Sequence, residues 1–161
     1  MTTPRSSGEQ RILDQVEAHY TRHPYPPLDT DRGFPLFAAL HYVRHVLWPE
    51  RSSLDGIRVL DAGCGTVLTA VRIALDFPEV QVTGVDLSTT AIALAQERAG
   101  RAGSPTNLAF RTTPIADLPD TSHFDYIISS GVLHHHASLA VSARRLATLL
   151  APTGGIGIMV Y

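Results

Sequence analysis

Several features that mark particular classes of protein are absent from this sequence. The chain has a single cysteine, Cys64, so no disulfide can form within it, and a cytoplasmic setting is expected. No apolar run approaches the roughly 20 residues of a membrane-spanning helix, and residues 1–10 lack the apolar middle of a secretory signal. The formal net charge of -2 carries no basic excess that would favour a nucleic-acid backbone. We therefore expect neither a membrane nor a nucleic acid as partner.

The composition that remains is that of an ordinary globular protein. Of the 161 residues, 44% are hydrophobic and 17% are charged, which fits one domain with a single core. The spacing of apolar residues changes near residue 54, from two helical patterns to short apolar runs that alternate with helical patterns. We expect an N-terminal helical segment over residues 1–53 and one ligand-binding α/β domain over residues 54–161.

The segment 1–53 holds two helical patterns separated by a proline-rich break. The first has Ser7 as its expected N-cap and one face formed by Ile12, Leu13, Val16 and Tyr20. Prolines at positions 24, 26 and 27 cannot lie inside a helix, because proline lacks an N–H group. The second helix is expected to begin at Pro35 and stop at Trp48, with an inward face of Leu36, Phe37, Leu40, Val43 and Leu47. Two interpretations of the break stay open: a rigid turn, or a lid whose Tyr20 and Tyr25 cover a binding site.

From residue 56 onward, short apolar runs alternate with longer helical patterns. The runs predict strands at 57–61, 80–86, 108–111, 124–129 and 156–161. The helical patterns cover 67–77, 89–99 and 139–150, with Ser88 as the cap of the second and the Gly154-Gly155 pair as a turn before the last strand. Regular alternation of this kind predicts a doubly wound parallel sheet with helices on both faces.

A glycine loop follows the first predicted strand. Gly63 and Gly65 let the backbone bend sharply between Asp61 and the next helix, where a ligand can approach closely. Asp86 ends the second strand, about 20 residues beyond the loop, and an acid there can accept hydrogen bonds from ribose hydroxyls. The loop and the acid together predict a site for an adenosine-bearing cofactor.

The loop favours a cofactor other than a dinucleotide. The dinucleotide fingerprint has a third glycine three residues after the second, and this chain has Leu68 there. Asp61 would also repel a pyrophosphate, whereas it would tolerate the ammonium group of an amino-acid tail. An NAD-linked oxidoreductase is therefore disfavoured.

The motifs resemble those of class I S-adenosylmethionine-dependent methyltransferases, which have a Rossmann-like fold. The matching stretches are VLDAGCGT (59–66), GVDLS (84–88), DLP (117–119), FDYII with VLHH (124–128, 132–135) and LAPTGG (150–155). The resemblance covers roughly residues 56–161. It implies S-adenosylmethionine as the cofactor and a five-stranded sheet in the order 3-2-1-4-5, preceded by the N-terminal helical segment.

The resemblance also implies the roles of site residues. The methionine part of the cofactor would contact Asp61, Ala62, Gly63, Cys64 and Gly65, with Ser130 and Gly131 closing that end. Asp86 would hold the ribose, and the adenine would lie against Leu87, Thr113, Pro114 and Ile115.

Three departures from the family pattern matter. Val67 stands where the family usually has a third loop glycine, and Pro114 stands where it often has an acid that contacts the adenine amino group. The family sheet normally continues beyond a fifth strand. We therefore expect either a fragment of a longer protein or a second chain covering the exposed fifth strand, with the fragment favoured.

His134, directly after the fourth strand, is the candidate general base for an acceptor of high pKa. The alternative is that positions 134–136 simply begin a loop and a helix. Because no cysteine or acid lies at ligand spacing from these histidines, no metal site is expected. The sequence at 129–132, SSGV, lacks the Asn-Pro-Pro-aromatic motif that serves amide and adenine-amine methylation.

The predicted function is methyl transfer to a small-molecule or protein acceptor. The alternative from another class is a non-catalytic module that binds S-adenosylmethionine or S-adenosylhomocysteine.

Overall fold

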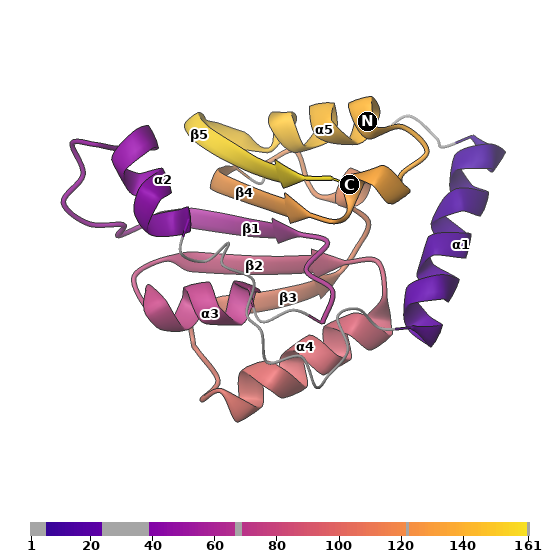
Figure 1. The fold of residues 1–161 in the computed structure, drawn as a ribbon, viewed down its shortest axis with the longest axis horizontal. Helices are drawn as coiled ribbons and strands as arrows, with labels where there is room; N and C mark the ends of the chain where they lie inside the picture. Colours follow the sequence, from indigo (N-terminus) through magenta and orange to yellow (C-terminus); the bar gives the residue numbers. More distant parts are fainter. Residues whose placement is uncertain (1–5, 24–38, 67–68, 122, 161) are drawn as a thin grey trace.

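The structure, a computed structural model, describes residues 6–23, 39–66, 69–121 and 123–160 and contains a five-stranded sheet (Figure 1). The strands are β1 (Arg58–Ala62), β2 (Gln81–Asp86), β3 (Leu108–Thr112), β4 (Phe124–Ser130) and β5 (Leu150–Met159). Every neighbouring pair is parallel, in the order β3-β2-β1-β4-β5. The Rossmann-like sheet predicted from the sequence is confirmed.

The two faces of the sheet carry separate cores. Val59 and Ile128 point to the face covered by α2 (Ala39–Leu47) and α3 (Thr69–Asp76). Leu60 and Ile127 point to the opposite face, covered by α5 (Leu139–Thr148). Successive side chains of a strand alternate between faces, so the middle of β1 (Val59, Leu60) and of β4 (residues 126–128) is apolar because both faces are buried there.

The helix caps test the predicted start signals. Ser88 caps α4 (Thr89–Arg101) as predicted, because its Oγ accepts from Ala91 N at 3.2 Å. The prediction for α1 (Ser7–Arg22) is wrong by one residue, since the cap is Ser6 and not Ser7. Ser6 Oγ accepts from Glu9 N at 3.2 Å, while the Glu9 carboxylate accepts from Ser6 N at 2.8 Å. Glu9 fixes the cap at Ser6, because only that spacing completes a capping box.

The second N-terminal helix belongs to the same core as the sheet. Leu40 and Trp48 are buried in the core cluster that also contains Ile73 of α3, and the Trp48 indole N–H donates to Thr153 O at 3.2 Å. The predicted start of this helix, Pro35, lies outside the described residues, as do Leu36 and Phe37. The division of the chain at residue 53 stays a prediction.

The predicted turn before the fifth strand is wrong. β5 begins at Leu150 and runs through both glycines, so the LAPTGG stretch is part of the strand. Phe124 of β4 lies opposite Leu150, and Tyr126 lies opposite Gly155, so a bulge absorbs the residues between them. An edge strand tolerates proline and a bulge that a central strand would not. Ile158 on this edge is 43% exposed, and its pairing with a second copy remains a prediction.

α1 stands apart from both helical layers. It lies across the carboxyl ends of the strands, at the side to which the strand arrows point (Figure 1). Carboxyl ends of parallel strands are where ligands bind in open α/β sheets, so α1 covers the expected site. Within the described part of the chain, no helix has the length and apolarity required to cross a bilayer.

Candidate functional site

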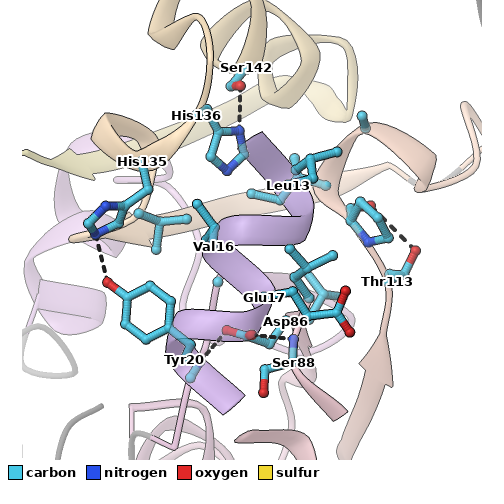
Figure 2. A pocket seen from close by; sticks show the side chains of 18 of the residues that line it. Leu13, Val16, Glu17, Tyr20, Asp86, Ser88, Thr113, His135, His136 and Ser142 are labelled. Carbon is cyan, nitrogen blue, oxygen red and sulfur yellow. Dashed lines mark hydrogen bonds between the residues drawn. The ribbon is translucent and has the colours of Figure 1, made fainter. Parts of the chain in front are cut away.

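A cavity of about 790 Å³ lies between the sheet and α1. Its floor is formed by the carboxyl ends of β1, β2 and β4 and the loops that follow them. Its roof is α1, which contributes Leu13, Val16 and Tyr20 (Figure 2). A volume of this size fits a cofactor together with a small second ligand, because drug-sized ligands occupy about 300–1,000 Å³.

The floor brings together nearly all of the residues that the sequence predicts for the cofactor. The lining includes Asp61, Gly63, Cys64, Gly65, Asp86, Leu87, Thr113, Pro114, Ile115, Ser130 and Gly131. Ala62 is the exception, because its side chain is fully buried in the core behind α5. Leu68 and Val67, which carry the argument about the third glycine, lie outside the described residues.

The glycine loop turns tightly around the end of β2. Gly63 N and Cys64 N both donate to Val85 O, at 2.8 and 2.9 Å. Gly63 has a φ of +82°, and a Cβ at this position would collide with the side chain of Val132. Only glycine therefore allows the loop and the segment after β4 to approach this closely.

Asp86 fixes the loop and the start of α4 at once. Its Oδ2 accepts from Gly65 N and its Oδ1 from Ser88 N, both at 2.8 Å. Burial raises the pKa of Asp86, while hydrogen bonds from the backbone of Ser88, Gly65 and Leu87 oppose that rise. Each carboxylate oxygen keeps a second lone pair, so Asp86 can still accept from a ligand hydroxyl.

Asp61 is the most perturbed acid on the floor. Its side chain is buried, and its Oδ2 has no hydrogen-bond partner. Burial, and then repulsion by Asp86, raises the pKa of Asp61 to about 7, although the backbone of Ala70 lowers it. A buried carboxylate with a bare oxygen is stabilised by a cation placed beside it.

The segment after β3 closes the other end of the floor. Thr113 N donates to Asp86 O at 2.9 Å, which keeps this segment against the end of β2. The Pro114 carbonyl accepts from Asp117 N at 3.0 Å, so it is already engaged within the loop. Asp117 also lines the cavity, although the residues predicted for the adenine end did not include it.

The histidines after β4 lie differently from the prediction. His134 is not among the lining residues, whereas His135 and His136 are. The short helix η3 (Leu133–His135) sets these directions, and the rings of His134 and His135 lie with centroids 4.0 Å apart and planes tilted by 49°. Burial is the main cause that lowers the pKa of His135, and electrostatic repulsion by His134 and His19 lowers it further. Three consecutive histidines gave no sequence signal to choose among them.

Tyr20 joins the roof to the floor. Its Oη lies 2.7 Å from His135 Nε2, and the two rings meet edge to face with centroids 5.5 Å apart (Figure 2). Thr21 Oγ1 lies 3.4 Å from Ser88 Oγ, a second polar contact between α1 and the sheet domain. Tyr20 therefore lines the cavity from the roof, while Tyr25 lies outside the described residues, and a lid function of this segment stays a prediction.

Several other lining residues were not predicted. They include Thr69, Ser88, Val132, Val141, Ser142 and Met159. Val141 and Ser142 come from α5 and Met159 from β5, so they reach the cavity only through tertiary packing. The apolar face of α1 was visible in the sequence, but its placement over the strand ends was not.

Comparison with known proteins places this chain in a family. The sequence model of a methyltransferase domain family matches residues 53–160. An uncharacterised methyltransferase of Mycobacterium bovis is 33% identical over 64% of this chain and 50% of its own length. A ubiquinone biosynthesis O-methyltransferase of Rhodopseudomonas palustris is 31% identical over 64% of this chain and 39% of its own length.

A solved structure agrees with these matches. The structure of PKMT2 from Rickettsia typhi in complex with AdoHcy covers 83% of this chain and 26% of its own, with a TM-score of 0.64 and 31% identity. The chain spans 37% and 50% of the lengths of the first curated relatives that it matches. The matched residues, the strand order and the motifs agree, and the chain belongs to the S-adenosylmethionine-dependent methyltransferase domain family with a Rossmann-like fold.

Proposed function

We propose that this chain binds S-adenosylmethionine in the cavity and transfers its methyl group to a small molecule that carries a hydroxyl group. The observation that carries the proposal is the joint placement of Asp61, the glycine loop and Asp86 around one cavity. When bound, the cofactor supplies a methyl group on a sulfonium, which is already a good leaving group. The chain's own part is then to orient the two ligands and exclude water.

The methionine end of the cofactor fits the Asp61 side of the floor. Asp61 Oδ2 is buried without a hydrogen-bond partner, and a ligand ammonium group would supply one. The same ammonium would offset the repulsion between Asp61 and Asp86. An anionic pyrophosphate would add to that repulsion instead, so the charge on this floor favours an amino-acid tail.

The ribose and adenine fit the other side of the floor. Asp86 has the remaining lone pairs to accept from two ribose hydroxyls, and Leu87 follows it along the cavity wall. Because the Pro114 carbonyl is occupied by Asp117 N, the Asp117 carboxylate is the better candidate for the adenine amino group.

The charge of the lining defines the class of acceptor. Acidic side chains such as Glu17 and Asp117 line the cavity, but no arginine or lysine is found among the described lining residues. A phosphate or carboxylate on the acceptor would find no cationic partner there. Leu13 and Val16 of the roof and the limited volume favour a small, largely apolar molecule without negative charge over a protein side chain.

A phenol is the hydroxyl that the cavity matches best. The Tyr20 phenol already lies against a cavity-lining imidazole, at 2.7 Å from His135 Nε2, so the site accommodates this chemistry. The similarity to ubiquinone biosynthesis O-methyltransferases supports oxygen as the methyl acceptor.

Calorimetry tests the cofactor. We expect S-adenosylmethionine and S-adenosylhomocysteine to bind at micromolar concentration or below and NAD not to bind. Asp86→Ala is expected to weaken binding by about 100-fold, because it removes a charged hydrogen-bonding group and releases Gly65. Asp55→Ala, at an exposed acid remote from the cavity, is the control. Binding of NAD alone would refute the proposal.

Methyl transfer is tested with catechol as a probe acceptor and radiolabelled S-adenosylmethionine. Labelled methyl groups in the catechol fraction would support the proposed acceptor class. Tight cofactor binding without transfer to any of a panel of phenols would favour the non-catalytic binding module instead.

A further inference from the structure

His136 has a geometry that neither of the neighbouring histidines shares. Its Nδ1 lies 2.6 Å from Ser142 Oγ of α5, and both side chains line the cavity (Figure 2). His135 has its Nε2 engaged by Tyr20 Oη at 2.7 Å, and His134 does not line the cavity. Of the three imidazoles, His136 alone lines the cavity with an Nε2 that no described residue hydrogen-bonds.

The contact with Ser142 can select the tautomer of His136. If Nδ1 carries the proton and donates to Ser142 Oγ, then Nε2 holds a lone pair. A helical serine can pass its own hydrogen to the carbonyl one turn earlier, which for Ser142 is that of Ser138. This leaves Ser142 Oγ as an acceptor for the imidazole.

We propose that His136 is the general base of the reaction and that Ser142 is the residue that positions it. The inference rests on the proposed function. The acceptor oxygen forms its bond to the methyl carbon as the carbon–sulfur bond breaks, and the electron pair of that bond leaves with sulfur. The hydroxyl proton of the acceptor passes to His136 Nε2, giving a methyl ether, a thioether and an imidazolium. A base oriented by a second polar group is the general pattern for such a proton transfer.

The surroundings of His136 keep it unprotonated at neutral pH. Burial, and then the field of His135, lowers the pKa of His136. The titratable groups that line the same cavity are His135 beside it, Glu9, Glu17 and Tyr20 of α1, and Asp61, Cys64, Asp86 and Asp117 of the floor. The ring is therefore able to accept a proton where an unperturbed histidine would already be partly charged.

Nuclear magnetic resonance of isotope-labelled histidine tests the tautomer without any acceptor. In the S-adenosylhomocysteine complex, we expect His136 Nδ1 to carry the proton and Nε2 to resonate as an unprotonated nitrogen. Ser142→Ala should shift the ring towards the opposite tautomer, and Ser142→Thr should restore the original one because it keeps the hydroxyl. A proton on Nε2 in the wild-type protein, or no change in Ser142→Ala, would overturn the proposal.

Methylation of catechol provides the second measurement. His136→Asn is expected to lower kcat at least about 100-fold, with little change in the affinity for S-adenosylhomocysteine. His123→Asn, at an exposed histidine before β4, is the matched control and should keep its activity. Undiminished activity in His136→Asn would overturn the role of the base.

The two proposals fail in different ways. A protein that does not bind S-adenosylhomocysteine contradicts the proposed function itself. Binding of S-adenosylhomocysteine without methylation of catechol contradicts the proposal that the acceptor is a phenol. The tautomer of His136 then still tests whether this histidine can act as the general base.

Discussion

α1 and α3 are both amphipathic, but they use their apolar faces differently. α3 buries five of its eight residues, among them Ile73 in the core. α1 buries none of its 16 residues, and its Leu13 and Val16 line the cavity instead. The floor of the site is therefore built on elements that the core stabilises, whereas the roof rests on a few polar contacts. Elements with few buried contacts open at low free energy, so the roof is the part suited to admit ligands.

The largest expected effect on stability comes from shortening a side chain of α3 that lies in the core. Ile73→Ala should lower the free energy of unfolding by about 2–5 kcal/mol, because it leaves a cavity in the core. Val16→Ala on α1 should change it by about 0.5 kcal/mol or less, while weakening the binding of catechol. Denaturant titration of both variants measures the difference. Equal losses would mean that α1 is as firmly packed as α3.

A substitution in the floor tests how tightly it is built. Gly63→Ala places a methyl group against Val132 at a φ of +82°, so we expect a loss of about 1–3 kcal/mol in stability and much weaker binding of S-adenosylhomocysteine. Gly100→Ala is the matched control, because its added Cβ would meet nothing within 4 Å and it lies in α4. That control should be neutral or stabilising. Normal ligand binding by Gly63→Ala would show that the loop has room to adjust.

Asp61 makes the floor sensitive to pH. Its pKa of about 7 in the folded protein lies above its ordinary 3.8, so Asp61 favours folding as pH falls from 7 towards 4 and disfavours it above 7. Below pH 7 a ligand ammonium must compete with the bound proton. We expect the affinity for S-adenosylhomocysteine to fall up to about tenfold per pH unit there, which is about 1.4 kcal/mol.

Asp61→Asn separates this effect from other titrations. The variant should bind S-adenosylhomocysteine weakly and with little dependence on pH between 5 and 8. At pH 8 it should also unfold at a higher temperature than the wild-type protein, because a buried charge has been removed. A wild-type affinity that is flat across this range would contradict the assignment of the ammonium to Asp61.

The smallest expected effect lies in the roof. Tyr20→Phe removes the hydrogen bond to His135 Nε2, which should weaken the docking of α1 by about 0.5–1.5 kcal/mol. Amide hydrogen exchange in α1 should accelerate accordingly, while the midpoint of global unfolding stays nearly constant. Tyr42→Phe, at a side chain that is 75% exposed, is the control. Unchanged exchange in α1 would show that Tyr20 does not hold the roof.

The sequence predicted the floor better than the roof. Asp61 and Asp86 could be placed together because parallel strands bring their carboxyl ends to one edge of the sheet. The order of the strands followed from the resemblance, and the cap at Ser88 followed from local chemistry. These features depend on short stretches of chain whose geometry the fold fixes.

What the sequence could not predict depends on tertiary contacts. The proposal of His136 in place of His134 as the base rests on the turn of η3 and on the contact with Ser142 of α5. Proline and glycine in LAPTGG are typical of a turn, so the sequence predicted one there. The bulge that accommodates these residues in a strand forms only by pairing with β4, which the sequence does not show. The apolar face of α1 had the same periodicity as a core helix, so its role at the cavity was hidden.

The double hold of Asp86 on Gly65 N and Ser88 N has a kinetic consequence. Both hydrogen bonds form within the protein, so a ligand meets a glycine loop that is already ordered. Little conformational entropy of the loop is therefore lost on association. Because α1 lies over the cavity (Figure 1) and none of its residues is buried, we expect the opening of α1 to set the rates at which a ligand enters and leaves. With the loop already held by Asp86, we expect ligand binding to depend on the movement of α1 more than on a rearrangement of the loop.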